Sequence, residues 1–127
     1  MFSKKSNKID NSIDTLIGAD ARIDGDVHFS GGLRIDGVIH GNVSEPDGSP
    51  CTLILSEHGT IEGAVTAAKI VINGKVVGPV KSSQFIELQA KARITGDLHY
   101  KSLEMHTGAV VDGRLIYVGE ETLDIES

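Results

Sequence analysis

The sequence predicts an all-β protein, a single-stranded parallel β-helix (β-solenoid) of about six coils. Between Ile86 and Leu98, apolar or small residues alternate with polar ones without a break, and a period of two is typical of strands with one buried face. Similar segments begin at residues 15, 33, 53, 70, 86 and 103, with spacings of 18, 20, 17, 16 and 17. A repeat of about 17 residues is too short for a helix pair or a propeller blade and suits one coil of three short strands.

A glycine recurs at one position of the repeat, as in Ile23-Asp-Gly-Asp-Val27 and Ile94-Thr-Gly-Asp-Leu98. It falls on the inward phase, where the chain turns a corner and a side chain would crowd the axis or oppose the backbone angle. Hairpin turns are the competing interpretation, and it is disfavoured because two-residue hairpin loops do not return the same face at a constant interval. One coil cannot bury its own inner face, so stacked coils share a core.

Composition agrees with one domain that has an aliphatic core. Hydrophobic residues make up 39% of the chain, aromatic residues only 4%, and there is no Trp. The net charge of −6 and the lack of a basic stripe argue against a nucleic-acid partner. No apolar run approaches the roughly 20 residues of a membrane span. The lone Cys51 has no disulfide partner and no secretory segment precedes the repeats, which indicates a cytoplasmic protein.

Residues 1–14 are predicted to form a disordered tail, whose first nine residues carry three lysines and no acid. One interpretation is a solvated terminus. The other is a membrane-binding segment, in which apolar residues insert at the interface and lysines meet anionic headgroups. Each lysine near an anionic leaflet contributes about 1 kcal/mol, so one tail binds weakly and many tails on one polymer bind by avidity. The residues of this segment are Met1, Phe2, Lys4, Lys5 and Lys8.

Residues 15–117 form the predicted β-helix, with coils one and two over roughly 15–43 and coils three to six beginning at 53. The intervening residues 44–52 contain two prolines and several turn formers, which predicts a surface loop at a corner. Residues 118–127 are predicted to be a disordered acidic tail, because the last nine residues carry four acids and no base.

The sequence supplies no cap for either end of the predicted solenoid. Exposed strand edges are normally covered by a helix, charges or proline, yet neither flank reads as an amphipathic helix and residues 110–118 are apolar on both phases. We therefore expect copies to stack through two-fold contacts at both ends, which would give a filament without polarity. The residues expected at these contacts are Leu16, Ile17, Val111, Leu115, Ile116 and Tyr117.

The six copies with recurrent Ile-x-Gly-x-Val, together with the opening Met1-Phe-Ser-Lys-Lys5, resemble the bactofilins, which are bacterial polymer-forming cytoskeletal proteins. The resemblance covers residues 1 to about 117. It implies a right-handed parallel β-helix of triangular section, nucleotide-independent assembly end to end, and in many members membrane attachment through the extreme N-terminus. Many members carry Phe just before the final acid-glycine pair, where this chain has Val111. Val111, Leu115 and Tyr117 therefore all stay open as the apolar C-terminal contact.

A trimeric β-helix enzyme, of the hexapeptide acyltransferase or gamma carbonic anhydrase type, is the alternative. Spacings of 16 to 20 break the strict six-residue rule of the hexapeptide class. The histidines share no spacing and have no His or Cys neighbour at a metal-ligand interval, so surface histidines are the better interpretation. They are His28, His40, His58, His99 and His106. The acids beside the recurrent glycines are interpreted as outward turn residues rather than as a catalytic carboxylate ladder. They are Asp24, Asp36, Glu62, Asp97 and Asp112.

The sequence thus predicts a structural polymer, not an enzyme, with no catalytic, metal or cofactor site. No phosphate loop is seen, because Asn73-Gly-Lys-Val76 lacks the rest of that motif. The expected partners are its own copies, inner-membrane lipid, and peptidoglycan-modifying or morphogenetic proteins, with no nucleic acid and no nucleotide. The expected location is peripheral, on the cytoplasmic face of the inner membrane, where the polymer would serve as a scaffold for cell-shape or cell-wall enzymes.

Overall fold

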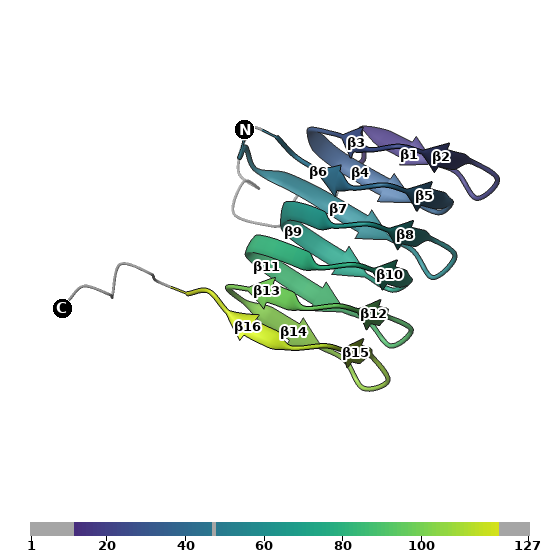
Figure 1. Cartoon of the computed structure of the whole chain (residues 1–127). Coiled ribbons are helices and arrows are strands. Elements are labelled where there is room, and N and C mark those ends of the chain that lie inside the picture. The colour runs from purple at the N-terminus through teal and green to yellow at the C-terminus, as the bar shows by residue number, and fades with distance from the viewer. Residues whose placement is uncertain (1–11, 47, 120–127) are drawn as a thin grey trace.

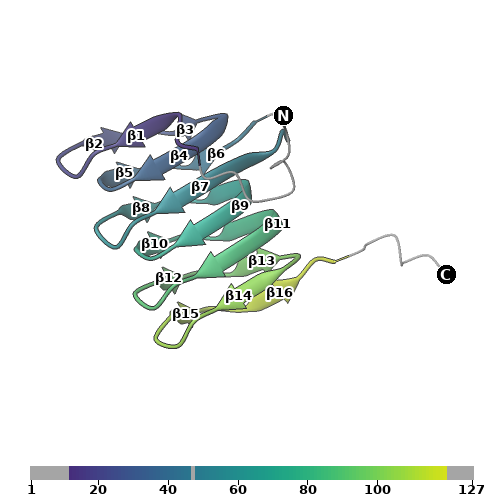
Figure 2. The same cartoon turned by 180° about the vertical axis from the view of Figure 1, so that it is seen from behind.

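The computed structural model describes residues 12–46 and 48–119, which form sixteen β-strands and no helix. Every strand pairing in this part is parallel. Figures 1 and 2 show the coils stacked in one pile, with β1 to β3 at one end and β14 to β16 at the other. Among the described residues no helix has the length and apolar character needed to cross a membrane.

The strands line up on three faces of the pile, as a triangular section requires. The first face contains β1 (Thr15–Ile17), β4 (Gly31–Ile35), β7 (Cys51–Leu55), the second part of β9 (Val65–Ile72), the second part of β11 (Val80–Leu88) and β14 (Leu103–Met105). The second face contains β2 (Arg22–Asp24), β5 (Val38–His40), β8 (Thr60–Glu62), β10 (Lys75–Val77), β12 (Arg93–Thr95) and β15 (Val110–Asp112). The third face contains β3 (Val27–His28), β6 (Val43–Ser44), the first parts of β9 and β11, β13 (Leu98–Tyr100) and β16 (Leu115–Tyr117).

The register of the first face reproduces the spacing of the sequence repeat. The partners that lie opposite one another on this face are the residues at which the six copies begin: Thr15, Leu33, Leu53, Ile70, Ile86 and Leu103. Each copy is therefore one coil. The predicted all-β parallel solenoid of about six coils is confirmed.

Most of the core consists of columns of inward apolar side chains that run along the pile. One column on the first face is Ile17, Ile35, Leu55, Ile72, Leu88 and Met105. Its members from Ile35 to Leu88 are at most 1% exposed. Burying one large aliphatic side chain contributes about 1.5–3 kcal/mol, so these columns, rather than any single coil, hold the fold together.

The loop between the second and third coils is shorter than predicted. Ser44 belongs to β6 and pairs with Thr66, and Cys51 begins β7 opposite Gly31. Both ends of the expected 44–52 loop are strand, because the ladders of the neighbouring coils continue to bind their backbone groups. Cys51 is accordingly a buried strand residue, not a loop residue, and burial raises the pKa of its thiol.

Candidate assembly ends

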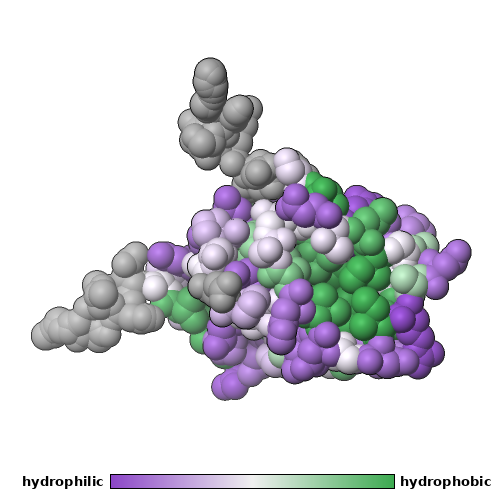
Figure 3. All heavy atoms as spheres, turned by 90° about the horizontal axis from the view of Figure 1, so that it is seen from above, coloured by the Kyte–Doolittle hydropathy of each residue, from purple (hydrophilic) through white to green (hydrophobic). Residues whose placement is uncertain are grey.

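The first coil closes one end of the pile with strands that are paired on one side only. Within residues 12–46 and 48–119, β1 pairs with β4, β2 with β5 and β3 with β6, and no strand lies on their other side. Figure 3 looks down on this end and shows apolar residues gathered over part of it. An unpaired strand edge beside an apolar surface favours addition of another β layer.

The N-terminal end surface is made by the first members of the core columns. Ile17 heads the column of Ile35 and keeps 8% of its surface exposed, while Ile23 and Val27 head two other columns and are partly buried. Leu16 pairs with Arg34 on the outward phase and is 59% exposed. Its side chain therefore belongs to the side of the pile rather than to the axis.

The last coil leaves the opposite ends of the columns uncovered. Leu115 is 46% exposed although its partner Leu98 is fully buried, and Met105 is 44% exposed although its partner Leu88 is fully buried. The difference arises because each buried residue has a coil on both sides, whereas each residue of the last coil has one. In the described part of the chain, β14, β15 and β16 pair only with the coil before them.

The predicted contact residues fall into two groups at this end. Val111 and Leu115 are the last members of two core columns. They occupy inward positions, as their partners Ile94 and Leu98 do. Ile116, opposite His99, takes the outward phase, as Leu16 does at the other end.

Tyr117 is 63% exposed and its ring centroid lies 5.8 Å from that of Tyr100, with the two ring planes tilted by 55°, so the rings are in contact between the last two coils. Met105, Ile23 and Val27 also lie at the ends of core columns but were not among the predicted contact residues. The spacing of the repeat could have identified them, because each aligns with a buried residue of the neighbouring copy.

A charged pair joins the last coil to the one before it. Arg114 Nη2 lies 2.8 Å from Asp97 Oδ2, and the backbone N–H of Arg114 donates to Asp97 Oδ1 at 3.1 Å. The hydrogen bonds from Arg114 lower the pKa of Asp97, and the carboxylate raises the pKa of Arg114. Asp97, predicted to be an outward turn residue, is therefore also a link between coils.

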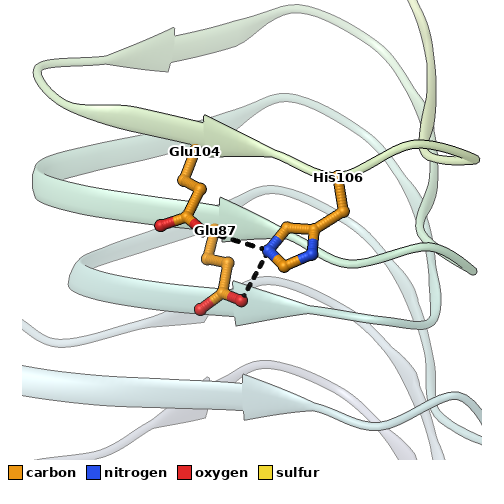
Figure 4. Close-up of side chains that lie close together, drawn as sticks. All are labelled: Glu87, Glu104 and His106. Atoms are coloured by element: carbon orange, nitrogen blue, oxygen red, sulfur yellow. Dashed lines mark ion pairs between the residues drawn. The ribbon is translucent and has the colours of Figure 1, made fainter.

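Three potential ligands converge on the first face near this end, as Figure 4 shows. His106 Nε2 lies 2.9 Å from Glu87 Oε2 and 3.2 Å from Glu104 Oε2. The three residues can bring one ligand atom each to within 4.8 Å of one another. His106 was predicted to be a surface histidine without a metal-ligand neighbour, so its approach to Glu87 and Glu104 was not predicted from the sequence.

The residues predicted to bind membrane lie outside the described part of the chain. They are Met1, Phe2, Lys4, Lys5 and Lys8.

Comparison with known proteins shows what the chain resembles. A family model described as "Bactofilin: Polymer-forming cytoskeletal" matches residues 15–116. Bactofilin BacO of Myxococcus xanthus is 27% identical over 101 residues, which cover 80% of this chain and 77% of BacO. Bactofilin BacP of the same species is 26% identical over 110 residues, which cover 87% of this chain and 43% of BacP. The chain thus spans less than half of BacP.

Two solved structures share the fold. The solid-state NMR structure of the cytoskeletal bactofilin BacA superposes with a TM-score of 0.71 and 35% identity, covering 83% of this chain and 96% of BacA. The cryo-EM reconstruction of Thermus thermophilus bactofilin double helical filaments gives a TM-score of 0.69 and 29% identity, covering 81% of this chain and 98% of that one.

Proposed function

The chain belongs to the bactofilin family of polymer-forming cytoskeletal proteins, and on that premise we propose that its two end coils join copies end to end, without nucleotide, into non-polar filaments. Family membership makes it a structural filament protein rather than the trimeric enzyme that was the alternative. The observation that carries the proposal is that, at both ends of the described pile, the strands are paired on one side only and the last side chains of the core columns are more exposed than those inside the pile.

Stacking of ends removes apolar surface from water and provides partners for open strand edges. Each contact would cover Met105 and Leu115 at one end, or Ile17 with its neighbours at the other. These gains arise from burial and strand pairing alone, so assembly needs no hydrolysis step. Leu16, Ile116 and Tyr117, on the rim of the two surfaces, would then surround the axial contact.

Electron microscopy and sedimentation of the full chain in buffer without nucleotide test this assembly. We expect filaments that pellet, with no change when ATP or GTP is added. Thr66→Glu, on an exposed position of β9 that is paired with a strand on both sides, changes the net charge by the same single unit and serves as the control for an end substitution such as Leu115→Glu. A monodisperse monomer over a wide range of salt and protein concentration would reject the proposal.

We further propose that the N-terminal segment of Met1, Phe2, Lys4, Lys5 and Lys8 attaches the polymer to the cytoplasmic face of the inner membrane. Its composition supports this, since three lysines without an acid accompany the apolar residues Met1 and Phe2. Attached filaments would present one face repeatedly to peptidoglycan-modifying or morphogenetic proteins, as a scaffold does.

Flotation of anionic liposomes in a density gradient tests the attachment, because filaments without bound lipid stay at the bottom. Removal of residues 1–8 is expected to abolish flotation with the vesicles, because it removes all three lysines and the apolar residues beside them. The matched control replaces three exposed lysines of the β-helix, Lys75, Lys81 and Lys101, by glutamine, and is expected to float as the full chain does. Equal flotation of the shortened and the full chain would remove the membrane role.

A further inference from the structure

The parallel register of the first face places two glutamates opposite each other in neighbouring coils. Glu87 of β11 pairs with Glu104 of β14 on the outward phase. Like charges directly opposite in a sheet repel each other, so a cation between the two carboxylates would relieve this repulsion. The exposed fractions of the side chains, 22% for Glu87 and 59% for Glu104, leave the pair open to ions from solvent.

His106 adds a nitrogen ligand to this pair. It follows Glu104 by two residues, so the same outward phase brings its ring over both carboxylates. Its Nε2 lies 2.9 Å from Glu87 Oε2 and 3.2 Å from Glu104 Oε2, as the dashed lines in Figure 4 mark. One Nε2–H can be aligned with one oxygen at a time, whereas a metal ion at the centre binds all three groups together.

From this convergence we infer that Glu87, Glu104 and His106 form a binding site for a divalent transition-metal ion of the zinc type. Zinc binds His nitrogen and carboxylate oxygen at about 2.0–2.2 Å, which places neighbouring tetrahedral ligands about 3.3 Å apart. The two distances of 2.9 and 3.2 Å are close to that separation. The nitrogen ligand selects against magnesium and calcium, which take oxygen ligands.

A second acid-histidine group in the chain shows why convergence matters. His40 lies between Asp24 and Glu62, with Nδ1 3.0 Å from one carboxylate and Nε2 3.5 Å from the other. The two acids approach different ring nitrogens, which point away from each other, so no single point is within bonding distance of all three. This group also has one histidine and two carboxylates, on another face, and serves as the control.

A metal ion at this site would link the last coil to the one before it. Glu104 and His106 belong to the last coil and Glu87 to its predecessor, where Gln89 Nε2 donates to Glu87 Oε2 at 3.3 Å and positions it. The last coil has a neighbour on one side only, so it opens more readily than the coils inside the pile. Bound zinc is therefore expected to slow opening of β14.

Equilibrium dialysis of the full chain against ZnCl2, after treatment with a chelator, tests the site. We expect the wild-type chain to bind zinc in a 1:1 ratio at this site, and the Glu104→Gln and His106→Ala variants to bind it more than about 100-fold more weakly, since losing even an outer-shell partner costs about 10–100-fold. The Glu62→Gln and His40→Ala controls are expected to bind zinc as the wild type does. MgCl2 at the same concentration is expected not to compete.

Hydrogen exchange of the wild-type chain, at a protein concentration below that of assembly, gives a second readout that needs no variant. Zinc is expected to slow exchange of the amides of residues 103–106 and to leave those of β5 and β8 unchanged. The site is rejected if the wild type shows no zinc binding below millimolar concentration, if Glu104→Gln and His106→Ala bind zinc as tightly as Glu62→Gln does, or if zinc leaves exchange in β14 unaltered.

Discussion

At the scale of single residues, glycines allow neighbouring coils to approach closely at the corners. Gly96 adopts a φ of 137°, and a Cβ built there would lie 2.6 Å from the carbonyl oxygen of Gly78 in the coil before. Gly78 in turn lies against Gly63, and Gly63 against Gly41. The recurrent glycine of the repeat is therefore required both by its backbone angle and by the glycine of the coil before it.

A second corner allows a test of this packing. A Cβ at Gly37 would strike the carbonyl oxygens of Gly18 and Ala21, whereas a Cβ at Gly18, in the corner of the first coil, meets nothing within 4 Å. We expect Gly37→Ala to lower the free energy of unfolding by about 1–3 kcal/mol, as overpacking does. We expect Gly18→Ala to change it by less than about 0.5 kcal/mol.

Urea unfolding, followed by circular dichroism at a protein concentration below that of assembly, would measure both substitutions. Equal unfolding midpoints for Gly37→Ala and Gly18→Ala would show that contact with the neighbouring coil does not determine the glycine requirement.

At the scale of strands, the position of a coil in the pile decides how tightly its strands are covered. β7 and β9 lie inside the pile with coils on both sides, and their inward side chains are almost wholly buried. β14 to β16 have one neighbouring coil, and none of their residues is fully buried. The link from Asp97 to Arg114 and the group around His106 both fasten this less covered coil to its neighbour.

At the scale of the whole molecule, the way in which the two ends contact each other determines whether the filament is polar. A two-fold contact joins like ends, so a charge at the C-terminal end blocks one kind of contact and leaves the N-terminal kind intact. Leu115→Glu is therefore expected to give dimers of rods joined through their first coils. In a head-to-tail filament every contact uses both ends, and the same substitution would give monomers.

Sedimentation equilibrium of Leu115→Glu distinguishes these outcomes. Monomers would contradict the non-polar arrangement, and filaments of wild-type length would show that Leu115 is not part of an end contact. Thr66→Glu, which adds the same single negative charge to the side of the rod, is expected to leave filaments unchanged.

Much of the fold could be predicted from the sequence, because both of its signals are set by the backbone. Alternation of apolar residues follows from strand geometry, and the spacing of copies equals the spacing of residues paired between coils, as Leu53 and Ile70 show. The core columns follow from those signals, as do the end strands that are paired on one side only within residues 12–46 and 48–119. The loop at 44–52 was predicted too long, because pairing with neighbouring coils extends β6 and β7 into it.

The candidate metal group illustrates what could not be read in advance. Glu87 and Glu104 are separated by one repeat, and His106 follows by two residues, yet the two carboxylates around His40 approach different ring nitrogens and do not converge. By itself the sequence determined the layers, their number and their order, because these depend on backbone periodicity. The tertiary structure alone decided which side chains meet across neighbouring coils and how far the last coil is exposed, since both depend on corner geometry and on which coils have two neighbours.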